Sequence, residues 1–272
     1  MRLTVLGCRA GMPSDGQASS GYLVTTDSTK ILLDCGPGIA TALSGVCPPA
    51  TLDAVVLSHL HNDHCHDLLP IGKKIIADQL GHPLAASATV DFRPPIPLYV
   101  PVGGRRLLDA LSALFPLATL PLLEKAFEVA FDVIEYEPGD TFEVGDCVIG
   151  LHELRHALPN CGVRVESPQA RLAYTGDTGV TDALVTLAGG VDLFLAEASL
   201  VETDTGDHGH LSAADAARAA HRAGAGRLVL THLPSAEPAF LAARSAAAAG
   251  EFGGPVLVAA PGSSYEISKD DV

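Results

Sequence analysis

The chain has 272 residues, 47% of them hydrophobic and 18% charged, which excludes a disordered protein and predicts a large buried core. Its 32 acidic and 17 basic side chains give a net charge of −15, which disfavours binding to a large nucleic acid. No apolar run is long enough for a membrane span, no signal peptide precedes the first strand-like segment, and six scattered cysteines fit reduced thiols, so we expect a cytoplasmic protein.

Short apolar runs rich in β-branched residues are bounded by glycine, proline and aspartate, which predicts strands. In chain order they cover residues 3–6, 22–26, 31–34, 54–58, 148–151, 162–165, 172–175, 193–196, 228–231 and 256–259. Helices are predicted over residues 105–114, 182–188, 212–223 and 239–249. The first half is rich in strands and the second mixes strands with helices. This order predicts an α/β protein with two packed sheets and helices on their outer faces.

Residues 70–101 differ from the rest because prolines interrupt them at positions 70, 83, 94, 95, 97 and 101. Proline fixes φ and lacks a backbone donor, so we expect an irregular excursion, either a lid or a plain surface loop. As a lid it could close over a base with Phe92, Ile96 and Tyr99. No other stretch suggests a boundary, so residues 1–272 are predicted to form a single domain.

A cluster of metal-ligand side chains follows the strand predicted over residues 54–58. Residues 59–64 read His-Leu-His-Asn-Asp-His. A strand that runs into a tight loop can direct His59 and His61 at one cation while Asp63 and His64 face a second. Imidazole and carboxylate ligands suit zinc, and also manganese or iron. The alternative is a hydrated polar loop with incidental histidines, which this density of ligands disfavours.

Two further ligand types stand at the ends of predicted strands. Asp177 ends the run LAYTGD and His232 ends the run LVLTH. Layered α/β proteins place ligands at such strand ends, along one edge of the sheet. One more histidine is needed near the first cation. Both His152 and His156 are candidates, and periodicity alone does not choose between them.

The order of these motifs resembles the metallo-β-lactamase-fold hydrolases. The order is H-x-H-x-D-H, a lone histidine, a strand end with T-G-D and a late strand end with T-H. The opening LGCRAGMPSDGQASSGYLV and the segment ILLDCGPG around Asp34 look most like the branch that contains tRNA 3′-processing endonucleases (ribonuclease Z-like) and small cyclic-nucleotide phosphodiesterases. The likeness runs from residue 2 to about residue 260. It implies the αββα metallo-β-lactamase fold, with two mixed sheets face to face, helices outside and metals at the sheet edges.

The resemblance also implies a complete ligand set for two divalent metal ions, zinc before manganese or iron. His156 is preferred over His152 because the segment HALPNCGVRV resembles the family's pattern, so His152 becomes a surface or supporting residue. The first ion would be held by His59, His61 and His156, and the second by Asp63, His64 and His232, with Asp177 bridging both.

Two residues beyond the ligands look like the catalytic pair of that branch. The segment EAS at Glu197 and the segment GHLS at His210 resemble its supporting glutamate and its proton-donating histidine. The alternative makes Glu197 a surface carboxylate and His210 a polar residue beside a helix, and His208 could compete for the role. His66, His82 and His221 are expected to be structural. His210, Glu197 and Asp63 are therefore expected to carry the catalysis.

Two divalent cations about 3.5–4 Å apart can share a hydroxide that attacks phosphorus in line while His210 protonates the leaving oxygen. Only 20 residues separate His156 from Asp177, too few for the arm with which the tRNA-processing enzymes grip tRNA. We therefore expect a phosphodiesterase for a small phosphodiester, with a cyclic nucleotide as the leading candidate. The alternatives are an ester, thioester or lactone hydrolase, a mononuclear iron oxidoreductase and a tRNA 3′-endonuclease. A homodimer is possible.

Overall fold

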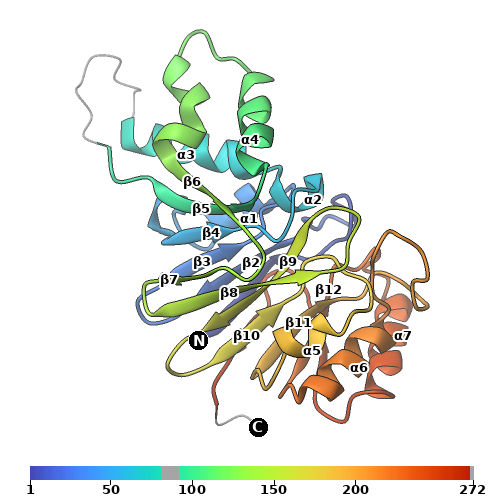
Figure 1. Ribbon diagram of the computed structural model, residues 1–272. Coiled ribbons are helices and arrows are strands. Elements are labelled where there is room, and N and C mark those ends of the chain that lie inside the picture. The colour runs from blue at the N-terminus through green and yellow to red at the C-terminus, as the bar shows by residue number, and fades with distance from the viewer. Residues whose placement is uncertain (81–91, 270–272) are drawn as a thin grey trace.

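In the computed structural model, which describes residues 1–80 and 92–269, the strands form two seven-stranded sheets that face each other (Figure 1). The first sheet has the order β14-β1-β2-β3-β4-β5-β6 and the second the order β13-β12-β11-β10-β9-β8-β7. Each sheet is mixed. In the first sheet, neighbouring strands are antiparallel from β14 through β1 and β2 to β3, and parallel from β3 through β4 and β5 to β6. In the second sheet, they are antiparallel from β7 through β8 and β9 to β10, and parallel from β10 through β11 and β12 to β13.

The strands of the first sheet are β1 (Arg2–Gly7), β2 (Gly21–Thr25), β3 (Lys30–Leu33), β4 (Ala54–Val56), β5 (Ile96–Pro101), β6 (Phe131–Tyr136) and β14 (Ser264–Glu266). Those of the second sheet are β7 (Thr141–Val144), β8 (Cys147–Leu154), β9 (Asn160–Glu166), β10 (Arg171–Tyr174), β11 (Leu193–Glu197), β12 (Leu228–Thr231) and β13 (Val256–Val258). The helices are α1 (Ile39–Ser44), α2 (Asn62–Cys65), α3 (Leu68–Leu80), α4 (Gly104–Ala113), α5 (Ala183–Leu187), α6 (Ala213–Ala223) and α7 (Pro238–Ala249). Short helical turns cover Pro49–Thr51, Pro121–Lys125 and Ala126–Ala130.

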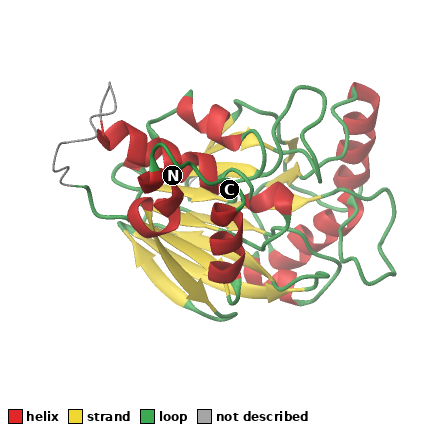
Figure 2. Ribbon diagram, turned by 90° about the horizontal axis from the view of Figure 1, so that it is seen from above, coloured by secondary structure: helices red, strands yellow, loops and turns green. Residues whose placement is uncertain are grey.

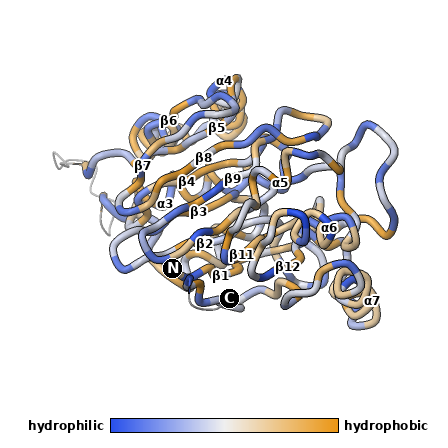
Figure 3. The backbone as a smooth tube through the Cα atoms, turned by 60° about the horizontal axis from the view of Figure 1, so that its bottom comes forward, coloured by the Kyte–Doolittle hydropathy of each residue, from blue (hydrophilic) through white to orange (hydrophobic). Residues whose placement is uncertain are grey.

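Three apolar layers hold this arrangement together. One layer lies between the sheets and includes Val5, Leu33 and Val163. A second covers the outer face of the first sheet under α1 and α3, and a third covers the outer face of the second sheet under α5 and α6. Figure 2 shows helices on both sides of the strands, and Figure 3 shows the hydropathy along each of these elements. The predicted αββα sandwich is thus the observed fold.

Helix α6 illustrates how the sequence sets an element that matters for the site. The Ser212 side chain accepts a hydrogen bond from the Asp215 backbone, and the Asp215 side chain accepts one from the Ser212 backbone, which is a capping box. Gly224 ends the helix with φ 63°, a conformation that glycine adopts readily. The predicted start and end of this helix are confirmed.

The prediction of an irregular excursion over residues 70–101 is wrong for residues 70–80 and 96–101, whereas residues 92–95 have no regular secondary structure. Helix α3 covers Leu68–Leu80 and strand β5 covers Ile96–Pro101. Pro70 falls in the first helical turn, where a missing backbone donor costs nothing. Pro97 and Pro101 flank Leu98 and Tyr99, the two β5 residues that pair with β4. Residues 81–91 lie outside the described residues, and a lid role for this segment stays a prediction.

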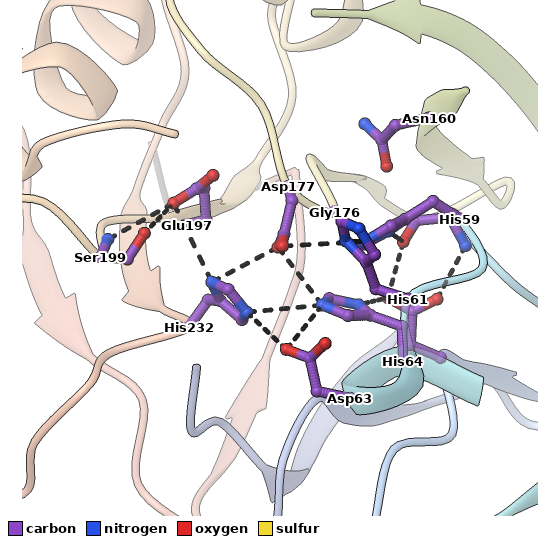
Figure 4. A network of polar contacts seen from close by, with 12 residues as sticks. His59, His61, Asp63, His64, Asn160, Gly176, Asp177, Glu197, Ser199 and His232 are labelled. Atoms are coloured by element: carbon purple, nitrogen blue, oxygen red, sulfur yellow. Dashed lines mark hydrogen bonds and ion pairs between the residues drawn. The ribbon is translucent and has the colours of Figure 1, made fainter. Parts of the chain in front are cut away.

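The sheet topology brings distant segments of chain to one edge. The strands β10, β11 and β12 are parallel neighbours, so their carboxyl ends meet at the same edge of the second sheet. The loop after β4 leaves the first sheet beside them, as Figures 1 and 4 show. None of the helices in the two described ranges combines the length and the apolar character that a membrane crossing requires.

Candidate active site

The predicted site residues converge where the loops after β4, β8, β10 and β12 meet (Figure 4). The described residues contain three groups of possible metal ligands, one of which joins Glu197 and His210 to Asp177 and His232. The other two contain the predicted ligands and share Asp177. We call them the outer group and the inner group, because two of the outer histidines are partly exposed while every inner ligand is buried. The outer group is His59, His61, His156 and Asp177, and the inner group is Asp63, His64, Asp177 and His232.

The outer group holds three imidazoles with their ring nitrogens turned toward one another. His61 Nδ1 lies 3.0 Å from His59 Nε2 and 3.1 Å from His156 Nε2. The Asp177 Oδ2 atom lies 3.7 Å from His59 Nε2. The three rings meet edge to face, with centroids 4.8–5.0 Å apart.

The inner group contains two carboxylates and two imidazoles. His64 Nε2 lies 3.4 Å from Asp63 Oδ2, 3.3 Å from Asp177 Oδ1 and 3.4 Å from His232 Nε2. His232 Nε2 lies 3.1 Å from Asp63 Oδ2. One ring nitrogen therefore faces three other ligand atoms at similar distances. Such an arrangement is typical of atoms that surround a common centre.

The residues present fit a divalent cation in each group. Ligand atoms about 2.0–2.1 Å from a tetrahedral zinc ion lie about 3.3 Å from one another, and the contacts above range from 3.0 to 3.7 Å. Asp177 offers Oδ2 to the outer group and Oδ1 to the inner one. Among the described residues, Asp177 Oδ1 and His232 Nδ1 are buried without a hydrogen-bond partner. Buried polar atoms are rarely left unpaired, so Asp177 Oδ1, which faces the inner group, points to a missing ligand. His232 Nδ1 lies 3.4 Å from that oxygen.

A fully buried carboxylate, Asp34, supports the inner group from behind. Its Oδ2 atom accepts hydrogen bonds from His64 Nδ1 at 2.7 Å, Tyr174 at 2.6 Å and the Ser58 hydroxyl at 2.8 Å. Its Oδ1 atom accepts from the Ser58 backbone at 2.7 Å. With Nδ1 protonated toward Asp34, His64 presents the lone pair of Nε2 to the site.

The outer histidines are oriented by weaker partners. His156 Nδ1 donates to the backbone carbonyl of Gly209 at 2.9 Å, and His59 Nδ1 lies 3.0 Å from the Ser58 hydroxyl. Both contacts leave Nε2 free to face the centre of the group. Sequence reasoning assigned no role to Ser58 and used Asp34 only as part of a family segment. The signal that marks Asp34 is a charged residue directly after the apolar run of residues 31–33.

The electrostatics of the site favour a bound cation. Burial opposes the charge of Asp63 and Asp177, yet the neighbouring histidines hold the pKa of both carboxyl groups well below the usual range. Burial also opposes the charge of His64, but Asp177 and Asp34 raise its pKa well above the ordinary value. Two carboxylates thus stay ionised at neutral pH, and a proton on His64 neutralises part of their charge. A divalent cation can replace that proton.

Close backbone contacts fix the ligand loops. A side chain at Gly36 would come within 1.9 Å of the Asp63 carbonyl oxygen, and one at Gly176 within 2.6 Å of Ser58 Cβ. Gly176 precedes Asp177 and has φ +58°, which favours glycine. His232 itself has φ +53°, an uncommon conformation for a residue with a side chain. Strained residues of this kind cluster at functional sites.

The predicted catalytic pair, His210 and Glu197, also meets at the site. His210 Nδ1 donates to Glu197 Oε1 at 2.8 Å and lies 4.0 Å from Asp177 Oδ2. Glu197 is fully buried and also accepts from the Thr178 backbone at 2.8 Å and the Ser199 hydroxyl at 2.6 Å. Burial opposes the charge of His210, but the hydrogen bond and charge of Glu197 raise its pKa to about 9.

The remaining histidines lie elsewhere in the described residues. His152 is a partly buried residue of β8 and belongs to neither ligand group. His208 is exposed, and its backbone carbonyl accepts a hydrogen bond from the Ala157 amide. His66 pairs with Asp67 at 3.3 Å, and His221 is exposed on α6. His82 lies outside the described residues.

A cavity of about 450 Å³ opens over the two groups. Ala10, Leu200 and Pro234 give it apolar walls, and ligand side chains and His210 give it a polar floor. A cavity of this size lies within the usual range for small-molecule sites.

The sequence profile of the beta-lactamase superfamily domain matches residues 29–233. The chain belongs to the beta-lactamase superfamily. It is an enzyme of the metallo-hydrolase type, and it is 31% identical to the probable metallo-hydrolase YhfI of Bacillus subtilis over 235 residues, which cover 86% of this chain and 87% of the relative. The crystal structure of YhfI covers 97% of this chain and 98% of its own, with a TM-score of 0.80 and 25% identity.

Two further relatives act on RNA according to their names. Ribonuclease Z of Mycobacterium bovis is 30% identical over 290 residues, which cover 95% of each chain. The short form of human tRNase Z has the same fold, with a TM-score of 0.73 at 24% identity over 98% of this chain and 99% of its own. The predicted fold and family are therefore confirmed.

Proposed function

We propose that this enzyme is a two-metal phosphodiesterase that hydrolyses a small phosphodiester, with a cyclic nucleotide as the leading substrate. The observation that carries the proposal is the position of His210. Its imidazole, held by Glu197, faces the same cavity as the inner and outer groups. This arrangement supports the proposal, because two cations and a proton donor at one site would together assist in-line displacement at phosphorus.

Divalent cations in the two groups, zinc before manganese or iron, would stabilise charge on the phosphoryl oxygens and lower the pKa of water. The protein's own residues then perform the remaining tasks. Asp177 spans both groups, and the Gly11 amide donates to Asp63 Oδ2 at 2.8 Å and fixes that carboxylate. His210, whose pKa is raised by its hydrogen bond with Glu197, would donate the Nε2 proton to the leaving oxygen. Glu197 holds Nδ1 and keeps the ring in position.

The size of the substrate follows from charge and cavity. The net charge of −15 repels a long polyanion, whereas a single phosphodiester meets only the local field of the site. The 20 residues between His156 and Asp177 contain strands β9 and β10, which leaves no room there for an RNA-gripping arm. The names of the ribonuclease Z relatives nevertheless make precursor tRNA the competing substrate to test.

The experiment measures hydrolysis of bis(p-nitrophenyl) phosphate, a cyclic nucleotide and a precursor tRNA after loading with Zn²⁺ or Mn²⁺. We expect the first two to be cleaved. Asp177→Ala should abolish both activities and metal binding, whereas Asp182→Ala, at an exposed aspartate, should change neither. His210→Ala should keep the metal and slow turnover of the cyclic nucleotide by roughly 10²–10⁴-fold. Cleavage of thioesters, lactones or precursor tRNA in place of small phosphodiesters would overturn the proposal.

A further inference from the structure

His210 is carried by a surface loop, residues 198–212, between β11 and α6. The loop projects from the body of the molecule beside α6 (Figures 1 and 3). A proton donor on such a loop needs anchors, because loops move more than the elements that they connect. Several of the anchors of this loop lie on one short segment, residues 155–157.

Two hydrogen bonds join the loop backbone to that segment. The Ala157 amide donates to the His208 carbonyl at 3.2 Å, and His156 Nδ1 donates to the Gly209 carbonyl at 2.9 Å. The contact is close, since a side chain at Gly209 would come within 2.4 Å of the Arg155 carbonyl oxygen. His156 is therefore hydrogen-bonded to the residue that directly precedes His210. The centroids of the two imidazole rings lie 5.2 Å apart.

Arg155 ties this contact to a third segment. Its guanidinium donates to the Gly206 carbonyl at 3.0 Å and to Asp204 Oδ2 at 3.2 Å. Its own carbonyl accepts from the Gly179 amide at 2.7 Å. A side chain at Gly179 would come within 2.2 Å of Arg155 Nη2, so the guanidinium lies directly over the loop that follows Asp177.

Asp204 accepts hydrogen bonds from backbone amides of its own loop. Its carboxylate accepts from the Gly206 amide at 2.7 Å and from the Gly209 amide at 2.9 Å, in addition to Arg155. These donors, with the His210 amide, hold the pKa of Asp204 below its ordinary value. One carboxylate thus fixes the backbone immediately before and at the proton donor.

We propose that Arg155 and Asp204 are a pair of positioning residues that set the place of His210 relative to His156 and Asp177. The inference rests on the proposed function, because it assigns the pair to the protonation of the leaving group. A partly exposed ion pair contributes little to stability. A displacement of a catalytic group by about 1 Å, in contrast, costs as much as about 10²-fold in rate. The pair should therefore affect catalysis more than folding.

The first test uses substrates that differ in their need for a proton. The nitrophenolate of bis(p-nitrophenyl) phosphate leaves readily, whereas the alkoxide of a cyclic nucleotide must be protonated. Arg155→Met should slow cyclic-nucleotide hydrolysis about 10²-fold, with less than about threefold change for the nitrophenyl ester and unchanged metal content. Arg155→Lys, which keeps one cationic donor, should restore part of the rate. The matched control is Arg222→Met, which breaks an exposed ion pair with Asp182.

The second test does not depend on activity. The proton on His210 Nδ1, which is hydrogen-bonded to Glu197, should give a separate downfield signal in the proton NMR spectrum of the metal-free protein. We expect Arg155→Met and Asp204→Ala to broaden or abolish this signal, and Arg222→Met to retain it. His210→Ala assigns the signal.

The outcomes separate the two proposals. If the wild type cleaves no phosphodiester, the proposed function fails, and the NMR signal still decides whether the pair positions His210. If Arg155→Met slows both substrates equally, or only weakens metal binding while the signal persists, the pair merely supports His156. Either result would overturn the inference.

Discussion

The inner and outer groups share Asp177 but are held by different parts of the fold. The inner ligands are all buried, contain two carboxylates and rest on Asp34, a residue of the apolar core. Two of the outer ligands, His61 and His156, are partly exposed, and His156 is oriented by a carbonyl of the surface loop. One group is thus built as part of the core and the other as part of the surface. We infer that the inner group binds its cation more tightly and the outer group adjusts more easily.

The largest expected effect is a difference between two ligand substitutions. His64→Ala removes an inner ligand and leaves the buried Asp34 carboxylate without its partner, so the tighter binding of Zn²⁺ should weaken by more than about 100-fold. His61→Ala should leave the tighter binding intact and abolish the weaker one. Calorimetric titration of the metal-free variants, with elemental analysis, measures both. Loss of the tighter ion in His61→Ala would reverse the comparison.

The second effect concerns the support of the inner group. All the contacts of Asp34 are donors, so Asp34→Asn places an amide NH₂ where an acceptor is required. Loss of such a supporting partner typically costs about 10–100-fold in metal affinity, and we expect this decrease for the tighter ion alone. Asp53→Asn, at an exposed aspartate that accepts from the Lys30 amide, is the control. Equal weakening of both ions would show that Asp34 does not distinguish the groups.

A smaller effect is expected from the loop that holds the outer group. Gly209 has φ +73° and lies against the backbone of His156, so Gly209→Ala is both strained and too close. We expect the weaker metal affinity to fall about tenfold, with the tighter one unchanged. Gly206→Ala, in the same loop with a nearest contact of 3.3 Å, should be tolerated. A lower affinity for the ion of the inner group in Gly209→Ala would contradict the comparison.

The smallest effect lies in the first turn of α6, which follows the same loop. Burial opposes the charge of Asp215, but hydrogen bonds from Ser212, Thr203 and Arg218 lower its pKa. A carboxyl group whose pKa is lower in the folded state stabilises the fold above its unfolded pKa and loses this contribution as the pH falls. In metal-free protein, Asp215→Asn should therefore cost about 1 kcal/mol at pH 7, and the difference from wild type should shrink below about pH 4. Urea denaturation at several pH values measures it, and a difference that grows in acid would contradict it.

Much of the site could be predicted because its residues stand at strand ends. Asp177, Glu197 and His232 follow or end apolar strands, and the parallel order of those strands brings them together. The choice between His152 and His156 could not be made from the pattern. The two positions are an even number of residues apart, so an alternating strand places them on one face. They differ because β8 ends at Leu154, which leaves His156 free to turn into the site.

The supporting contacts were not predictable for a different reason. The contacts of Asp34 with His64 and of Arg155 with Asp204 join residues far apart in sequence, and no spacing rule reveals them. The error over residues 70–101 has a local cause. Counting prolines does not reveal that Pro70 occupies a first helical turn or that Pro97 and Pro101 fall outside the pairing of β5 with β4.

The inner ligands come from both halves of the sandwich, since Asp63 and His64 follow a strand of the first sheet while Asp177 and His232 follow strands of the second. A cation held there would cross-link the two sheets. Ligands that bind only the folded state stabilise it in proportion to the logarithm of their concentration. The supply of metal in the cell would then set how often the two halves separate. The lifetime of the protein against proteolysis, as well as its catalytic rate, would then depend on the concentration of available metal.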